Sequence, residues 1–191
     1  MTQINKALAN FFFEMRQLRE EQRSGWQLIG IPNKESVAEH LLRAAQIAFA
    51  LAILEGYPNP EKVATMLVFH DIGEARIGDN HKVTARYLVD VREEGAVIDQ
   101  TEELGAVGER ILELWKETED RITQEGIIAK DADYLECAFT AKEYYDQGHV
   151  LAADWFNNVR AALKTQSAKD LCDQMLTMNA HEWWKGLKKL S

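Results

Sequence analysis

Apolar residues recur through most of this chain at the spacing of one helical face, and the stretch after Ser36 shows the pattern most clearly. Its apolar positions are Val37, Leu41, Ala44, Ile47, Ala48 and Leu51. Residues three and four apart share one side of an α-helix, so this pattern predicts a helix with a buried stripe. The segment Ser36-Val37-Ala38-Glu39 has the form of a capping box, and we expect the helix to run from about 37 to 55 and to stop at Gly56.

The same period predicts helices along the rest of the chain. Their expected ranges are about 3 to 23, 37 to 55, 60 to 77, 83 to 92, 97 to 117, 123 to 146, 150 to 164 and 168 to 186. Asn59-Pro60 supplies an N-cap with proline at the first helical position, and Gly78 ends that helix. The pair Trp183-Trp184 predicts a terminal helix docked on the core or on a second subunit. Strand patterning is weak, so the predicted fold class is all-α.

Composition and charge narrow the kind of protein. A hydrophobic content of 46% in 191 residues is enough for one sizeable core, so we expect a single domain. The net charge of -9 argues against a nucleic-acid partner, because such a protein needs a basic surface. The apolar run from 44 to 54 is interrupted by Gln46 and is too short to span a bilayer, so no membrane association is expected. The two cysteines, Cys137 and Cys172, suggest a reducing cytoplasm, because they form neither a disulfide framework nor a zinc motif.

An adjacent imidazole and carboxylate, His70-Asp71, lie inside an apolar stretch that begins Met66-Leu67-Val68-Phe69. Unpaired polar groups are costly in such a setting, and this pair can give one nitrogen and one oxygen to a divalent cation. Glu74 lies one helical turn beyond His70 on the same face, where it could hold or polarise a metal-bound water. In the alternative interpretation, Glu74 only pairs with Arg76 or Lys82.

Two further segments offer metal ligands. His40 falls on the buried stripe of the helix after Ser36, although a lone histidine there is often only a hydrogen-bonded core residue. Another predicted helix carries Asp131 and Asp133 beside its apolar stripe. Either aspartate could face inward, and periodicity alone does not choose between them. Helical bundles build metal sites from inward-facing residues at matching depth, so these segments are candidates for the remaining ligands.

The ordered set His40, His70-Asp71 and Asp133 resembles the HD superfamily of metal-dependent phosphohydrolases, and within it the 5'-deoxynucleotidase branch. The matching segments are Gly25-Trp26, Glu35-Ser36-Val37-Ala38-Glu39-His40, His70-Asp71-Ile72-Gly73-Glu74-Ala75, Gly78-Asp79, Leu114-Trp115-Lys116-Glu117 and Lys130-Asp131-Ala132-Asp133. An isolated His-Asp dipeptide would mean little, whereas this ordered series along most of the chain is specific.

The resemblance implies a site and a reaction. In that branch the last metal aspartate lies three residues after a lysine, which makes Asp133, after Lys130, the fourth ligand. One divalent ion is implied, and the ligand types suit Mn²⁺, Co²⁺, Ni²⁺, Fe²⁺, Zn²⁺ or Mg²⁺. The implied substrates are deoxyribonucleoside 5'-monophosphates, cleaved to a deoxynucleoside and phosphate. Glu74 would orient or deprotonate the attacking water, and Asp79 would be a second catalytic carboxylate in contact with the substrate, unless it only caps its loop.

Two more substrate-binding residues are implied. Some members of the branch carry arginine directly before the tryptophan, where this chain has Gly25, so Arg23 is expected to bind the phosphate instead. Trp26 is expected to lie against the sugar and exclude the 2'-hydroxyl of ribose, or else to plug a gap between the first two helices.

The resemblance also implies how the whole chain is organised. We expect one HD domain over residues 1–191, with the metal core at about 36–140 and the C-terminal helices 150–186 packed on it. A homodimer is the expected assembly.

Two rival functions remain open. The same metal core in other HD branches hydrolyses cyclic nucleotides, guanosine tetraphosphate or deoxynucleoside triphosphates, but the short chain and the lack of basic clusters for polyphosphate weigh against these substrates. Alternatively, the chain is a nucleotide-binding metalloprotein without turnover.

Overall fold

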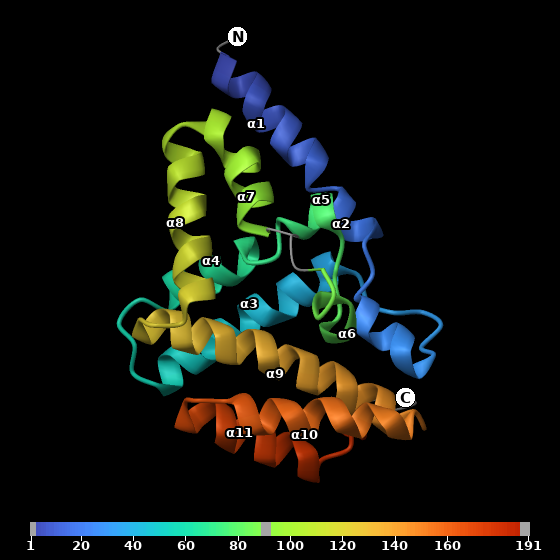
Figure 1. Cartoon of the computed structure of the whole chain (residues 1–191). Coiled ribbons are helices and arrows are strands. Elements are labelled where there is room, and N and C mark those ends of the chain that lie inside the picture. The colour runs from blue at the N-terminus through green and yellow to red at the C-terminus, as the bar shows by residue number, and fades with distance from the viewer. Residues whose placement is uncertain (1–2, 89–92, 188–191) are drawn as a thin grey trace.

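A computed structural model describes residues 3–88 and 93–187, which form helices and the loops between them (Figure 1). This part of the chain holds α-helices and short 3-10 helices but no β-strand, and an isolated antiparallel bridge joins Gln22 to Ser36. The predicted all-α fold class is confirmed.

The helices differ widely in length. The α-helices are α1 (Gln3–Glu14), α2 (Gln17–Glu20), α3 (Val37–Leu54), α4 (Pro60–Phe69), α5 (Glu74–Ile77), α6 (Lys82–Ala85), α7 (Glu93–Thr101), α8 (Ala106–Asp120), α9 (Gln124–Asp146), α10 (Ala153–Ala162) and α11 (Gln166–Thr177). The 3-10 helices are η1 (Ser24–Ile29), η2 (Glu102–Leu104) and η3 (Val150–Ala152).

Two apolar clusters form the core. In the larger cluster α3, α4 and α9 pack against one another, and α10 and α11 lie along α9 on the side away from α8 (Figure 1). Its buried side chains include Leu51 of α3, Leu135 of α9 and Cys172 of α11. The smaller cluster joins α1 to α7 and α8 and includes Phe11 and Trp115. α10 and α11 thus pack against the larger cluster.

The candidate metal ligands lie where the two clusters meet. The segment that carries His70-Asp71 runs from Leu67 in the larger cluster to Ile72 in the smaller one. On α3 the apolar neighbours of His40 likewise belong to both clusters. Both imidazoles are consequently enclosed, with exposed fractions of 0% for His40 and 1% for His70.

Local sequence sets the start of α3 and α4 as predicted. The Ser36 hydroxyl accepts a hydrogen bond from the backbone N–H of Glu39, and the Glu39 carboxylate accepts one from the backbone N–H of Ser36. At α4 the Asn59 side chain accepts from the N–H of Lys62, and Pro60 occupies the first turn. Both predicted helix starts are therefore confirmed.

The helix that was predicted to carry His70 and Asp71 is shorter than expected and ends before them. α4 ends at Phe69, and His70 and Asp71 lie in the four-residue turn that follows. α5 then runs from Glu74 to Ile77 and is followed by Gly78, whose φ is 74°. The break coincides with a close approach of α7. A Cβ atom on Gly73 would lie only 2.6 Å from Cγ of Glu93, so a larger residue in the turn would have to displace the Glu93 side chain.

Three other predicted helices are also divided or shortened. A turn after α1 splits the range 3–23, and α2 then buries Leu18 in the smaller cluster. The range 97–117 is divided among α7, η2 and α8. Gly105 separates η2 from α8, because its φ of 56° cannot continue a right-handed helix. Of the range 83–92, α6 covers the first residues, and residues 89–92 lie outside the described part of the chain.

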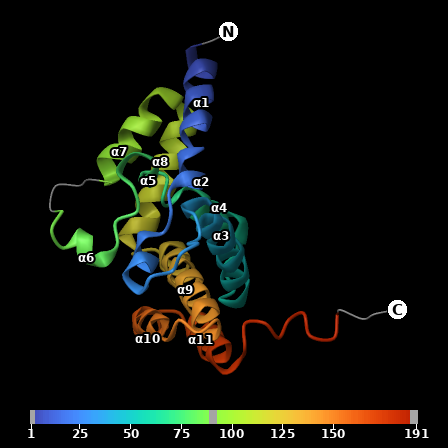
Figure 2. The same ribbon diagram turned by 90° about the vertical axis from the view of Figure 1, so that its right-hand side faces the viewer.

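The end of the chain departs most from the prediction. The last helix stops at Thr177, and the segment after α11 runs away from the helices (Figure 2). The carboxylate of Asp146 accepts a hydrogen bond of 2.8 Å from the backbone N–H of Ala180, which holds the start of this segment in a non-helical path. Trp183 and Trp184 are 75% and 44% exposed. The prediction of a terminal helix docked on the core is wrong, whereas docking on a second subunit stays a prediction.

Among the described helices, α3 is long and apolar enough to cross a membrane by length and composition, with a mean hydropathy of 1.5. The core helix of a globular protein passes the same test, and 44% of this window is buried within the protein.

Candidate metal centre

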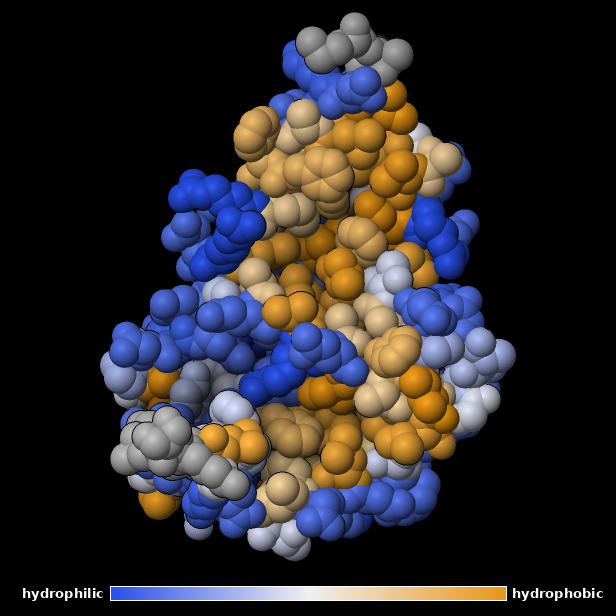
Figure 3. All heavy atoms as spheres, turned by 180° about the vertical axis from the view of Figure 1, so that it is seen from behind, coloured by the Kyte–Doolittle hydropathy of each residue, from blue (hydrophilic) through white to orange (hydrophobic). Residues whose placement is uncertain are grey.

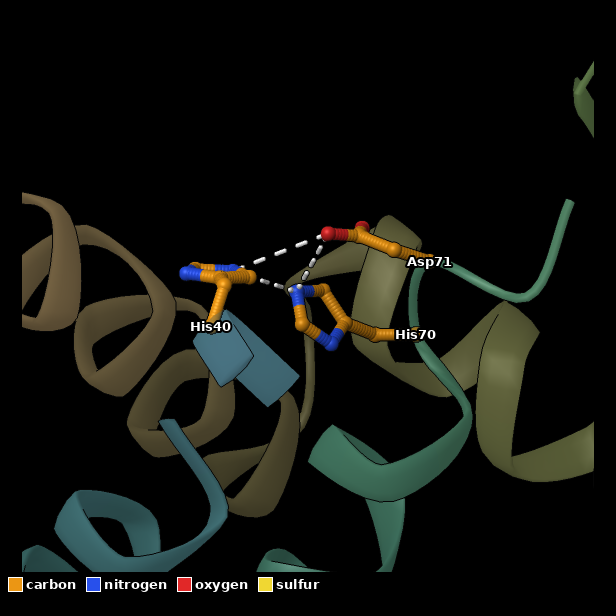
Figure 4. A group of neighbouring side chains, drawn as sticks. All are labelled: His40, His70 and Asp71. Carbon is orange, nitrogen blue, oxygen red and sulfur yellow. Dashed lines mark hydrogen bonds and ion pairs between the residues drawn. The ribbon is translucent and has the colours of Figure 1, made fainter. Parts of the chain in front are cut away.

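Side chains from three parts of the chain converge on one small space. The His40 Nε2 atom lies 3.3 Å from His70 Nε2, 3.6 Å from Asp71 Oδ2 and 3.3 Å from Asp133 Oδ1. The His70 Nε2 atom lies 3.2 Å from the same Asp71 oxygen and 3.6 Å from the same Asp133 oxygen. Figure 4 shows three of these side chains pointing toward one another: His40 from α3 and the His70-Asp71 pair from the turn after α4.

The other nitrogen of each imidazole is already engaged. His70 Nδ1 lies 2.9 Å from the backbone oxygen of Leu67, and His40 Nδ1 contacts the carboxylate of Glu136. Because a carbonyl and a carboxylate both accept hydrogen bonds, each Nδ1 carries a proton, and each Nε2 faces the shared space, where it can give its lone pair to a metal once it is deprotonated. Both histidines are thus held in the tautomer that binds a metal through Nε2.

This donor set fits one divalent ion. Donors bound at about 2.0–2.2 Å to one ion lie roughly 3–3.5 Å from their neighbours, and the measured separations of 3.2–3.6 Å match that spacing. Two imidazoles and two carboxylates suit the borderline and hard divalent metals. The residues present therefore fit the divalent metal that an HD fold implies.

The electrostatics of the site favour a cation. Burial lowers the pKa of His70, but the carboxylates of Asp71 and Asp133 outweigh it and raise that pKa well above its usual range. Burial raises the pKa of Asp133, but the Lys130 ammonium and the two imidazoles lower it well below its usual value. Buried carboxylates thus draw positive charge to the position between them.

Three charged residues border the four candidate ligands. Arg23 Nη1 lies 3.3 Å from Asp71 Oδ2, 3.9 Å from Glu74 Oε1 and 3.7 Å from Asp79 Oδ1. Burial and the neighbouring Asp71 carboxylate raise the pKa of Glu74 to about 10. Among the described residues, Glu74 Oε2 is buried and has no hydrogen-bond partner. The structure therefore brings Arg23, Glu74 and Asp79 together beside the candidate ligands.

Asp79 also has a structural role, because it links two segments of the chain. Its Oδ2 accepts a hydrogen bond from the backbone N–H of Ser24, and its own N–H donates to Glu21 Oε1 at 3.1 Å. Asp79 therefore ties the loop after α5 to the segment that carries Arg23. The loop-capping interpretation of this carboxylate is seen in the structure, and a contact with substrate stays a prediction.

Trp26 lies inside the protein, with 2% of its surface exposed. Its indole N–H donates a hydrogen bond of 3.0 Å to Glu35 Oε1, and its ring packs against Tyr144 and Trp155 with centroids 5.2 and 5.3 Å away. A Cβ atom on Gly25 would lie 3.6 Å from the Trp155 indole nitrogen. Trp26 is therefore packed inside the protein, but against α9 and α10 and not between the first two predicted helices. Its hydrogen bond puts Glu35 between Trp26 and the candidate ligands.

The two aspartates of α9 point to different sides of the helix. Asp133 faces the imidazoles, whereas Asp131 is fully buried and pairs with Arg121 at 2.6 Å. Asp131 also accepts hydrogen bonds from the backbone N–H groups of Lys164 and Thr165, just before α11. Residues two apart on a helix differ by about 200° in direction, which explains this separation.

Sequence reasoning missed three residues that support the site. Glu136 contacts His40, Arg43 binds Glu136, and Lys130 Nζ lies 3.3 Å from Asp133 Oδ2. Each lies three residues from a candidate ligand on the same helix, and positions three apart share a helix face. This three-residue spacing could have identified them from the sequence. A charged residue on the same helix face as a buried ligand is itself turned toward the interior, where it needs a partner.

Comparisons with known proteins agree with this geometry. The family model described as HD domain matches residues 15–175, which include all four candidate ligands. The chain is 35% identical to a 5'-deoxynucleotidase of Dictyostelium discoideum over 151 residues, which are 74% of this chain and 79% of that protein. It is 28% identical to a human 5'-deoxynucleotidase over 75% of this chain and 71% of that protein. A solved structure of a conserved hypothetical protein from Pyrococcus furiosus is 27% identical, with a TM-score of 0.72 over 89% of this chain and 99% of that chain.

Proposed function

Because this chain belongs to the HD domain family, we propose that it is a metal-dependent phosphomonoesterase that hydrolyses deoxyribonucleoside 5'-monophosphates to a deoxynucleoside and phosphate. The observation that carries the proposal is the convergence of two imidazole nitrogens and two carboxylate oxygens within 3.2–3.6 Å, with the partly buried Arg23 and Glu74 beside them. The names of the relatives support the substrate class.

We infer that His40, His70, Asp71 and Asp133 hold one divalent ion, for which Mn²⁺, Co²⁺, Ni²⁺, Fe²⁺, Zn²⁺ and Mg²⁺ are candidates. When bound, such an ion lowers the pKa of a water and of nearby acidic groups and offsets negative charge on the phosphoryl group.

Glu74 is the proposed general base. Its buried, unpartnered Oε2 atom is free to accept a hydrogen bond from the attacking water and then to take its proton. Arg23 brings a permanent positive charge within 4 Å of three carboxylates and is the proposed ligand for the substrate phosphate. Asp79 positions the Arg23 segment through Ser24 and is the second proposed catalytic carboxylate.

Trp26 is proposed to limit the sugar pocket from behind. With 2% of its surface exposed, it would act through Glu35, whose carboxylate it holds next to His40 and Glu136. If Glu35 is held rigidly by Trp26, a 2'-hydroxyl is costly to accommodate beside it, which favours deoxyribose over ribose.

We also propose the wider setting of this activity: one domain over residues 1–191, a cytoplasmic location and no nucleic-acid partner. The two cysteines are free and the net charge is -9. Both properties are consistent with that setting.

The proposed assembly is a homodimer. Leu42, Phe49 and Ile53 are 65%, 41% and 55% exposed and recur at helical spacing along one side of α3. Figure 3 shows apolar side chains gathered in a band over the face that includes α3 and α4. A face of this kind fits a second copy of the chain. Light scattering should give twice the chain mass for wild type, and Phe49→Arg combined with Ile53→Arg should reduce it to one chain mass.

The deciding experiment for the activity is a phosphate-release panel with metal-replete protein over deoxy- and ribonucleoside monophosphates, deoxynucleoside triphosphates, cyclic nucleotides and guanosine tetraphosphate. Release from deoxyribonucleoside monophosphates supports the proposal. Turnover of another class alone would assign the chain to a different HD activity, and tight nucleotide binding with no turnover would make it a sensor.

A further inference from the structure

A second group of donor atoms lies directly behind the candidate metal centre. One atom each from Glu35, His40 and Glu136 falls within 4.8 Å of the others. The group shares His40 with the metal centre but uses the opposite ring nitrogen, Nδ1, which contacts Glu136 Oε2. By residue type this group could hold a second ion, or it could orient the histidine for the first one.

The contacts of Glu136 decide between these possibilities. Its side chain is fully buried, and its Oε1 accepts hydrogen bonds from Arg43 Nε at 2.9 Å, Arg43 Nη2 at 2.7 Å and Thr140 Oγ1 at 3.0 Å. Its Oε2 is taken by His40 Nδ1. Both oxygens are therefore engaged, and the Arg43 guanidinium already supplies the positive charge that a second ion would bring.

We propose that Glu136 is a positioning residue for the metal centre and that the group around it is not a second metal site. The carboxylate fixes the His40 ring with its proton on Nδ1, so that the Nε2 lone pair faces His70, Asp71 and Asp133. Carboxylates behind metal-bound histidines both orient the ring and make it a stronger ligand. The inference rests on the proposed function only in requiring a metal at His40.

The two histidines of the metal centre differ in the group that holds Nδ1. His70 Nδ1 is held by the backbone oxygen of Leu67, a contact that survives most side-chain substitutions. His40 depends on a carboxylate from another helix, ninety-six residues away in sequence. A single substitution in α9 can therefore release one metal ligand while the other ligands stay in place.

The test compares Glu136→Gln with Glu143→Gln. Glu143 binds the same arginine, with Oε1 2.6 Å from Arg43 Nη1, but its side chain is 41% exposed and it does not touch His40. Affinity for Co²⁺ and Zn²⁺ is measured by chelator competition, stoichiometry by elemental analysis, and ligand geometry by the visible spectrum of the Co²⁺ form. Melting temperatures of the metal-free proteins report folding, and Arg43→Gln serves as a second variant in case Glu136→Gln does not fold.

Wild type should bind one ion per chain. Glu136→Gln should weaken its affinity roughly 10- to 100-fold and alter the Co²⁺ spectrum, whereas Glu143→Gln should match wild type. Arg43→Gln should weaken affinity less than Glu136→Gln, because the carboxylate remains. Unchanged affinity and spectrum in folded Glu136→Gln would overturn the positioning role. Two ions per wild-type chain, with one lost on substitution, would show that the group is a second metal site.

The same measurements separate this inference from the proposed activity. A wild-type chain that binds one ion but releases no phosphate from any nucleotide contradicts the activity and leaves the comparison of affinities valid. A wild-type chain that binds no divalent ion would overturn both the metal centre and the role of Glu136.

Discussion

Asp131 and Asp133 lie two residues apart on α9, both are buried, and they serve opposite sides of the molecule. Asp133 is 9% exposed and faces two imidazoles and the ammonium of Lys130. Asp131 is 0% exposed and holds Arg121 together with the backbone N–H groups that precede α11. Burial and residue type are nearly the same on the two sides, but the partners differ.

The difference shows what identifies a functional carboxylate. The partners of Asp131 are an arginine, the Thr165 hydroxyl and backbone donors, and these satisfy its charge within the protein. The partners of Asp133 include two histidines whose other ring nitrogens are already occupied, so that their remaining lone pairs converge with the carboxylates. Convergence of lone pairs, rather than burial, marks the side that binds a cation.

The largest expected effect is on the metal side. His70→Ala and Asp133→Ala should each lower the content of bound divalent metal and abolish measurable turnover, because each removes one of four converging donors. Elemental analysis and phosphate release on purified variants measure both quantities.

Asp131→Asn is the matched control for that pair, since it alters the other aspartate of the same helix while keeping its size. It should keep most of the metal and most of the activity. Full metal occupancy in both His70→Ala and Asp133→Ala would disprove the proposed ligand set.

The next largest expected effect is a loss of kcat without a loss of metal, caused by a substitution at Glu74. Glu74→Gln should retain the metal and the fold but lose roughly 10²- to 10⁴-fold in kcat, the usual range for removal of a general base. Steady-state phosphate release at a saturating deoxynucleotide concentration measures the loss. If kcat stays at the wild-type value while the metal is retained, Glu74 has no role in proton transfer.

On the other side of α9 the expected effect is on stability. Asp131→Ala removes the charged partner of Arg121, which retains the Ala162 carbonyl oxygen, and the acceptor of the two N–H groups before α11. It should therefore cost roughly 3–5 kcal/mol in the free energy of unfolding, as when one partner of a buried ion pair is removed. Urea unfolding of the metal-free variant and wild type gives this value. A change below about 1 kcal/mol would mean that water replaces the carboxylate and that the buried Asp131 contacts contribute little to the free energy of unfolding.

The smallest expected effect concerns Trp26, which is buried like Asp131 yet is proposed to influence the substrate. Trp26→Phe removes the indole N–H that holds Glu35 and keeps most of the packing, whereas alanine would open a large cavity. We expect the ratio of kcat/KM for dAMP over AMP to fall several-fold, on the order of the 1 kcal/mol that one hydrogen bond contributes. Metal content should not change.

Two outcomes would correct this interpretation. An unaltered dAMP to AMP ratio in Trp26→Phe would leave Trp26 with packing as its only role. Equal rates for the two nucleotides in wild type would contradict the deoxynucleotidase proposal itself.

Local features of the fold were predictable because they depend on neighbours in sequence. The capping box at Ser36 and the Asn59-Pro60 start use hydrogen bonds that close within four residues, and both are present. Helix interruptions were not predictable from the hydrophobic period. The turn before Glu74 exists where Glu93, twenty residues away, packs against Gly73, and no local pattern contains that contact.

The candidate metal centre likewise has features that the sequence predicted and features that depend on tertiary contacts. The sequence by itself determined the ligand types: an adjacent histidine and aspartate in an apolar segment, a second histidine on a buried stripe, and two aspartates of which periodicity could not choose one. The family resemblance implied Asp133, and the tertiary structure places it against the imidazoles. Only the tertiary structure decided that Asp131 holds α11 and that Glu136 contacts His40. The reason is physical: residue type fixes which atoms can bind a cation, but the rotation of each helix about its axis is set by packing against helices that are distant in sequence.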